Sequence, residues 1–119
     1  MLALLLLGGV SIITSTAAVA RPRTVVTEQA TLTYYLEGGV THSGMYTQEG
    51  VTVGCGWDVP DGALVTFSTG ETFICADKGA TSGPWVDYYT PSPARGQAFV
   101  QSHADYCPYA CYATVTFSW

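Results

Sequence analysis

The sequence predicts a mainly β fold with a single short helix. Two observations lead to this prediction. Six short runs rich in β-branched and aromatic residues are separated by turn residues, and only one segment carries the start signals of a helix. The spacing of the runs is typical of a β-barrel or a β-sandwich. Residues 21–119 are enough for one compact domain, whereas two would be too small to bury separate cores.

The first strand, or a pair of strands, is expected in residues 24–36, which end at a Glu37-Gly38-Gly39 turn. Further strands are expected at 51–53, 63–67, 72–76, 85–89 and 112–117. Turns are expected at Pro60-Asp61-Gly62 and Ser68-Thr69-Gly70, because these residue types favour tight backbone turns.

The one helix is predicted from Ser92 to about His103. The Ser92 hydroxyl can cap the first turn, and Pro93 suits the first helical position because its fixed φ is helical and no N–H is needed there. Ala98 and Phe99 continue the helix, while Gly96 weakens it because glycine loses much backbone entropy in a helix.

Residues 1–20 resemble a secretory signal peptide. A leucine-rich core is followed by a polar break at 14–16, and Ala18-Val19-Ala20 fits a signal peptidase site. No Lys or Arg precedes the core and Arg21 follows it, so an uncleaved anchor or a different start site is the alternative. We expect cleavage near Ala20 and export. No membrane span is expected in the mature protein, because Thr14–Thr16 interrupt the only long apolar run.

The charge balance argues against nucleic acid as a partner. Four Lys and Arg residues face nine Asp and Glu residues, which gives a net charge of −5 at pH 7. A protein that neutralises phosphates needs the opposite balance.

Four cysteines predict two disulfides, because an even count in a small exported domain is typical of a disulfide framework. Sequence alone allows three pairings, of which we favour Cys55 with Cys75 and Cys107 with Cys111. A zinc site is the alternative, but neither a second close cysteine pair nor histidines at finger spacing accompany Cys107 and Cys111. We therefore predict neither a metal nor a cofactor.

The order of motifs in the second half of the chain is informative. Asp77-Lys78-Gly79-Ala80 is followed by Asp87 within Trp85-Val86-Asp87-Tyr88-Tyr89, and then by Ser92-Pro93-Ala94. This order resembles the three-aspartate (3D) domains of lytic transglycosylase A, and more loosely rare lipoprotein A and the expansins. The Thr31–Tyr35 strand, the Thr41-His42-Ser43-Gly44 turn and the Pro60-Asp61-Gly62 turn agree with the resemblance.

The resemblance implies a six-stranded double-psi β-barrel with one short helix over residues 30–119, after a lead-in at 21–29. It also implies cleavage of the β-1,4 bond between N-acetylmuramic acid and N-acetylglucosamine without water. By position, Asp87 resembles the catalytic acid and Asp77 its neighbour. Apolar neighbours and a second carboxylate would raise the pKa of Asp87, as such an acid requires. The alternative is that Asp77 caps a turn and Asp87 accepts backbone hydrogen bonds.

Six aromatic residues are candidates to contact sugar rings: Trp57, Trp85, Tyr34, Tyr35, Tyr88 and Tyr89. Tyr88 and Tyr89 are adjacent in a strand and point to opposite faces, so only one of them is expected to line a groove. Our predicted substrate-binding residues are Trp85, Tyr88, His42 and Tyr35, with His42 included because its turn often lines the groove of the resembled family.

Two functions follow from these expectations. The first is a secreted enzyme that cleaves peptidoglycan glycan strands with Asp87 and Asp77. The second is a non-catalytic, expansin-like module that holds glycan or serves as an extracellular structural protein. Gly54 or Cys55 stands where the resembled family often carries a further acidic residue, which favours the second function.

Overall fold

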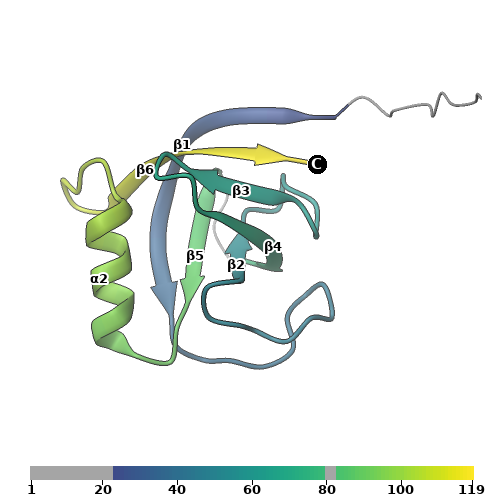
Figure 1. The fold of residues 1–119 in the computed structure, drawn as a ribbon, viewed down its shortest axis with the longest axis horizontal. Coiled ribbons are helices and arrows are strands. Elements are labelled where there is room, and N and C mark those ends of the chain that lie inside the picture. The colour runs from purple at the N-terminus through teal and green to yellow at the C-terminus, as the bar shows by residue number, and fades with distance from the viewer. Residues whose placement is uncertain (1–22, 80–82) are drawn as a thin grey trace, which may run out of the picture.

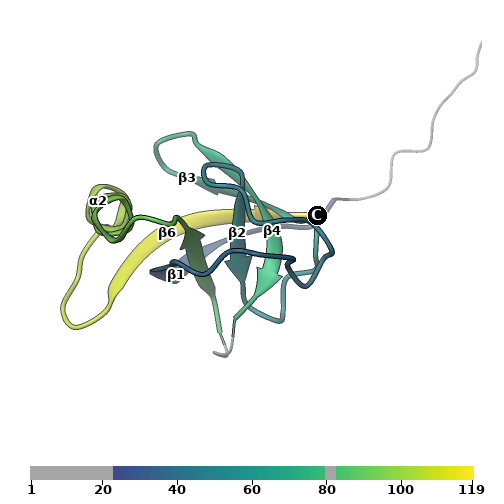
Figure 2. The same cartoon turned by 90° about the horizontal axis from the view of Figure 1, so that it is seen from below.

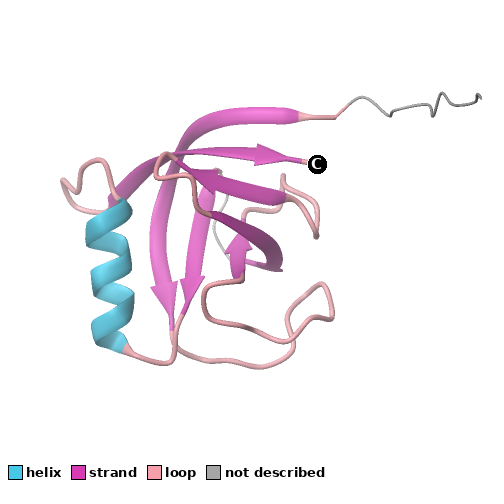
Figure 3. Cartoon of the chain, viewed as in Figure 1, coloured by secondary structure: helices cyan, strands magenta, loops and turns pink. Residues whose placement is uncertain are grey.

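A computed structural model describes residues 23–79 and 83–119, so the predicted signal peptide lies outside the described residues. The strands are β1 (Val25–Tyr35), β2 (Thr52–Cys55), β3 (Leu64–Phe67), β4 (Thr72–Lys78), β5 (Trp85–Tyr89) and β6 (Cys111–Ser118), and the helix is α2 (Pro93–His103). Figures 1 and 3 show the strands wrapped into a barrel with α2 outside it. The predicted class, mainly β with six strands and one short helix, is confirmed.

The barrel is closed in the order β1-β5-β2-β4-β3-β6. The β1–β5 and β2–β4 pairs are parallel, and the other four neighbouring pairs are antiparallel. The two strands of each parallel pair are not consecutive in the chain. The chain must therefore cross the barrel between them. The crossings bring β1, β5, β2 and β4 side by side, although they come from distant parts of the sequence.

Strand β1 begins at Val25, inside the segment predicted as a lead-in. It starts there because Val25 pairs with Ser118, and the pairing with β6 continues to Leu32 and Cys111. The second half of β1 pairs with β5, from Thr31 with Trp85 to Tyr35 with Tyr89. One long strand therefore serves two neighbours, and the barrel domain extends before residue 30.

The other predicted strands are present with small shifts at their ends. Strand β5 has the predicted bounds, whereas β4 continues to Lys78, two residues beyond the prediction. This extension follows an irregularity in the β2–β4 ladder between Val53 and Gly54, after which Gly54 pairs with Asp77. The irregularity matters because it places Asp77, and not Ala76, opposite Gly54.

The barrel interior is filled by alternate residues of the strands, with Val53, Val65, Val86, Val115 and Phe117 fully buried. Three phenylalanines close the end of the core under α2. Phe67, Phe73 and Phe99 meet edge to face, with ring centroids 5.6 to 5.7 Å apart. Figure 2 shows α2 to one side of the strands, where Phe99 joins it to this core.

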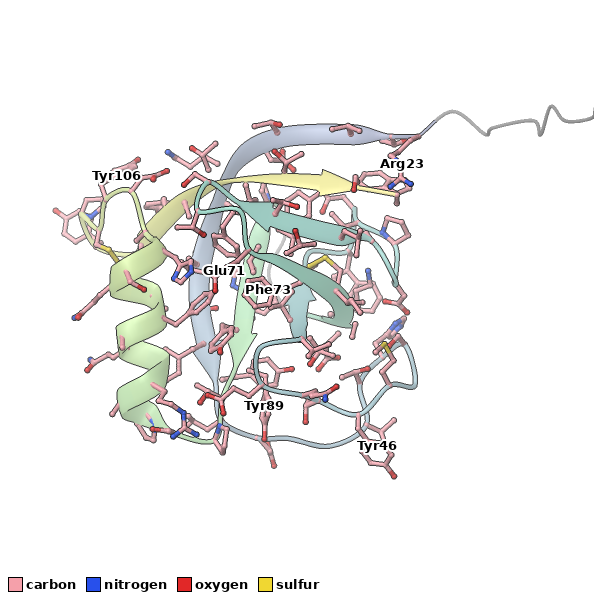
Figure 4. All side chains as sticks on the ribbon, viewed as in Figure 1. Arg23, Tyr46, Glu71, Phe73, Tyr89 and Tyr106 are labelled. Carbon is pink, nitrogen blue, oxygen red and sulfur yellow. A yellow bond between two sulfur atoms is a disulfide. The ribbon has the colours of Figure 1, made fainter. Side chains whose placement is uncertain are left out.

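Helix α2 has the predicted start. The Ser92 hydroxyl accepts a hydrogen bond from the Arg95 N–H at 3.2 Å, and Pro93 occupies the first turn. Gly96 has a packing role that the sequence did not reveal, because a Cβ there would lie 2.2 Å from the Tyr34 ring. At the other end of α2, the His103 imidazole stacks on Phe99 and contacts Glu71. Phe73 also meets Phe99, so Glu71 and Phe73 both lie on the side of the barrel that faces α2 (Figure 4).

Both favoured disulfides are present. The Cys55–Cys75 bond lies fully buried between β2 and β4, with the two Cα atoms 5.5 Å apart. The Cys107–Cys111 bond closes a tight loop directly before β6. Within the described ranges, no helix is long and apolar enough to cross a membrane.

Candidate functional site

Four residues form a row across four neighbouring strands. Thr33 of β1 is in register with Asp87 of β5, Asp87 with Gly54 of β2, and Gly54 with Asp77 of β4. Asp87 lies on the outer face of the barrel, because its neighbours Val86 and Tyr88 point into the core. The two predicted catalytic residues therefore share one surface of the barrel.

Gly54 places no side chain between Asp87 and Asp77. A Cβ at Gly54 would lie 3.4 Å from the Cβ of Asp87 and 3.8 Å from the Cβ of Asp77. Both aspartates thus border the same point, and no side chain of β2 separates them. Gly54 is one of the two positions, with Cys55, where the resembled family often carries a further acidic residue.

Asp87 is the titrating group of the site. Burial raises its pKa to about 6, the negative charge of Asp77 raises it as well, and a hydrogen bond from Thr33 opposes both effects. The Thr33 hydroxyl donates to Oδ1 of Asp87 at 2.7 Å, which fixes the orientation of the carboxyl group. A carboxyl group that titrates near pH 6 can donate a proton and later accept one close to neutral pH.

Asp77 is held by the backbone. Its Oδ1 accepts the N–H of His42 at 3.1 Å and the N–H of Lys78 at 3.0 Å. The first bond ties the loop after β1 to the end of β4. Asp77 therefore has the turn-capping contacts of the alternative interpretation, and it also supplies the charge next to Asp87.

Tyr35 brings a buried hydroxyl to the same surface. Burial raises the pKa of Tyr35 well above its usual value, and the charges of Asp77 and Asp87 and a polar interaction with the Asp77 carboxylate raise it further. The hydroxyl forms no hydrogen bond of normal geometry with any described residue. Because it stays protonated, it is a hydrogen-bond donor at neutral pH.

The Trp85 ring packs directly on Gly79 and lies next to Gly54, between the strands of the two aspartates. Its ring lies where a Cβ of Gly79 would be, at 1.5 Å, so any other residue at 79 would displace it. The same ring lies 3.6 Å from the Cβ position of Gly54. The structure thus brings the predicted residues Trp85 and Tyr35 together with Asp77 and Asp87.

His42 joins a neighbouring cluster with Trp57. The His42 Nδ1 is 2.7 Å from Oδ2 of Asp61, and its ring meets Trp57 edge to face at 5.1 Å. Trp57 is 62% exposed and donates its ring N–H to the Gly79 carbonyl at 2.7 Å. The Lys78 ammonium lies 5.9 Å from the Trp57 ring. An oriented, exposed aromatic ring therefore lies against the residues that adjoin Asp77.

Tyr88 does not belong to this surface. It is only 8% exposed and stacks on Phe99 with ring centroids 3.7 Å apart, so it is a core residue. Its neighbour Tyr89 is on the outer side of β5 and meets Tyr35 at 5.5 Å. As expected, only one of the two adjacent tyrosines faces outward. It is Tyr89, so the prediction of Tyr88 as a substrate-binding residue is wrong.

Sequence reasoning missed Thr33 and the role of Gly54. Both are ordinary residue types for their positions, and only the register between β1, β5 and β2 connects them with the aspartates.

Among the residues that the structure describes, no group of three or more His, Cys, Asp or Glu side chains is placed to hold a metal ion. No family model, curated protein or solved structure matches the chain.

Proposed function

We propose that the protein cleaves glycan strands of peptidoglycan, with Asp87 as a single general acid and base. The observation that carries the proposal is the Asp87 carboxyl group, which has a pKa of about 6 on the outer face of the barrel and is oriented by Thr33 beside Asp77. The two disulfides agree with an extracellular place of action.

In this proposal one carboxyl group serves both proton transfers. Protonated Asp87 gives its proton to the glycosidic oxygen as the bond to the muramic acid C1 breaks. The resulting carboxylate then removes the proton from the 6-hydroxyl of the same sugar, whose oxygen bonds to C1. The products are a 1,6-anhydro end and a free 4-hydroxyl, Asp87 is again protonated, and no water is consumed.

The test is to incubate residues 21–119 with purified peptidoglycan and analyse the soluble products by mass spectrometry. We expect muropeptides with 1,6-anhydro ends. Hydrolytic products with reducing ends, or no products between pH 4 and pH 8, would contradict the proposed reaction.

Replacing Asp77 with Asn is expected to move the pH dependence of cleavage. The negative charge of Asp77 raises the pKa of Asp87, so its removal lowers that pKa. The acid then loses its proton at a lower pH, and the high-pH limb of the activity profile shifts toward acid. Initial rates measured from pH 4 to pH 8 check this shift. An unchanged limb would mean that another group sets it.

A second candidate function is a glycan-binding module without catalysis. It is favoured by Gly54, which leaves the third acidic position empty, and by the exposed Trp57 ring beside the site. The mass-spectrometric test separates the two functions, because a module would retain glycan and release no product.

Both functions predict that Trp57 contributes to glycan binding. Trp57→Ala should weaken retention on insoluble peptidoglycan by roughly tenfold, as expected when stacking on a sugar ring is lost. Its melting temperature should change little, because most of the ring is exposed. Trp119→Ala is the matched control, since Trp119 is also a partly exposed tryptophan but lies at the end of the chain beyond β6. Equal retention of the two variants would exclude Trp57 from the binding surface.

A further inference from the structure

Strand β1 loses one of its two neighbours at Leu32. Its ladder with β6 ends at the pair of Leu32 with Cys111, whereas its ladder with β5 continues to Tyr35. Beside this last part of β1, on the side away from β5, Figure 1 shows α2 instead of a strand. The end of β1 is thus a strand edge that faces a helix.

The disulfide loop before β6 explains why the ladder stops. If the register continued, Tyr109 would face Tyr34. The Cys107–Cys111 bond instead holds this segment in a tight loop, and Tyr109 is fully exposed. The chain therefore turns away from β1 after the Leu32–Cys111 pair, two residues before Tyr34.

The main chain of Tyr34 points to this open edge. The Thr31 N–H donates to the Pro84 carbonyl at 3.0 Å, and the Tyr35 carbonyl accepts the Thr90 N–H at 3.1 Å. Odd-numbered residues of this stretch therefore bond toward β5, and the residues between them face the other edge. By this alternation the Tyr34 N–H and C=O do not bond to β5, the β6 ladder ends before them, and no turn, loop or side-chain hydrogen bond of a described residue reaches them. One donor and one acceptor are available at strand spacing beside the Leu32–Cys111 pair.

A groove of about 340 Å³ lies along this edge between β1 and α2. Leu32, Tyr34, Val100 and Cys111 give it a largely apolar lining, and Gln97 and Gln101 of α2 contribute side-chain amides. Among the residues that the structure describes, no charged side chain lines it. The groove therefore combines free main-chain bonding groups, amide side chains and apolar surface.

We propose that this groove binds an extended, uncharged peptide segment, which adds to β1 as an antiparallel strand in line with β6. A peptide backbone offers an N–H and a C=O at the spacing that Tyr34 requires, as β6 does for Leu32. The two glutamines can bond to further peptide groups, and the apolar lining can cover alternate side chains. A purely apolar ligand would leave the Tyr34 groups without partners. The proposal does not depend on the reaction proposed for Asp87.

Amide hydrogen exchange of Tyr34 tests the proposal. The probe is the blocked peptide acetyl-Thr-Val-Thr-Val-Thr-amide, and exchange is followed residue by residue by NMR on the mature protein. In the free protein, the Tyr34 amide should exchange faster than those of Thr33 and Tyr35, which bond to β5. At saturating peptide, Tyr34 exchange should slow by roughly tenfold or more, as expected for one new backbone hydrogen bond. The fully N-methylated peptide should give no protection, because its methyl groups keep its carbonyls away from the strand edge and it has no N–H to donate to the Tyr34 carbonyl.

A variant of α2 provides the second arm. Gln101→Trp should fill the groove and weaken binding by roughly tenfold or more, whereas Ala98→Trp, exposed on the outward side of α2, should bind like the wild type. Several results would overturn the proposal: a Tyr34 amide already protected in the free protein, no protection at saturating peptide, or equal protection by the N-methylated peptide. An apolar dye that binds in the groove while the peptide does not would assign it to small ligands instead. If the Gln101→Trp variant does not fold, the comparison of Tyr34 protection by the unmodified and N-methylated peptides in the wild type still tests the proposal.

Discussion

Asp87→Asn should lower glycan cleavage by roughly 100-fold to 10,000-fold, the usual loss when general acid catalysis is removed. Asparagine has nearly the same shape and can still accept the Thr33 hydrogen bond, but it cannot transfer a proton. Binding to peptidoglycan should therefore survive. Release of anhydro-muropeptides and retention on the insoluble polymer are measured on the same preparation. Glu28→Gln is the control, because Glu28 lies in the half of β1 that pairs with β6.

The same variant should not lose stability at neutral pH. The pKa of Asp87 is raised in the folded state to about 6, so between about pH 4 and pH 6 the folded protein binds more protons than the unfolded chain. Wild-type stability therefore falls as pH rises through this window and stays lower above it. Asn removes this cost, which is on the order of 1 to 2 kcal/mol after allowance for partial exposure of the carboxyl group.

Denaturant unfolding at pH 4 and pH 7.5 checks this expectation. The difference in stability between Asp87→Asn and the wild type should be more favourable to the variant at pH 7.5 than at pH 4. A variant that is less stable at pH 7.5 and has no activity to lose would instead make Asp87 a structural residue. Lower activity together with equal or higher stability is the result expected for a catalytic acid.

The second large effect is expected from the buried disulfide. Replacing both Cys55 and Cys75 with Ala should lower the free energy of unfolding by about 3 kcal/mol, because the bond closes a loop with a sequence separation of 20. The loss should also reduce cleavage, since Cys55 follows Gly54 directly and the bond joins the two strands that carry Gly54 and Asp77. Urea unfolding and the muropeptide assay measure the two effects.

The second disulfide provides the comparison. Cys107 and Cys111 are only four residues apart, so in the chain-entropy model their replacement costs less, about 2 kcal/mol. It should leave the acidic pair in place, because neither cysteine lies in β2, β4 or β5. If this replacement reduced cleavage as much as loss of the Cys55–Cys75 bond does, the site would depend on general stability and not on the β2–β4 link.

The sequence by itself determined the features that depend on neighbouring residues. Ser92 and Pro93 predicted the start of α2, because capping requires groups only a few residues apart. The run from Trp85 to Tyr89 predicted β5 with the observed bounds. The favoured pairing of Cys55 with Cys75 also agrees with the structure, although spacing alone left three pairings open.

Only the tertiary structure decided how distant segments meet. Whether Tyr88 or Tyr89 faces the core depends on which side of β5 the barrel closes, and a strand pattern leaves both choices open. Thr33 and Gly54 become neighbours of Asp87 through the parallel β1–β5 pair and the antiparallel β2–β5 pair, whose strands are far apart in the sequence. Gly96 appeared to weaken α2, yet it is required because the Tyr34 ring occupies the place of its Cβ. Local preferences set the elements, whereas register and close packing between remote residues set the site.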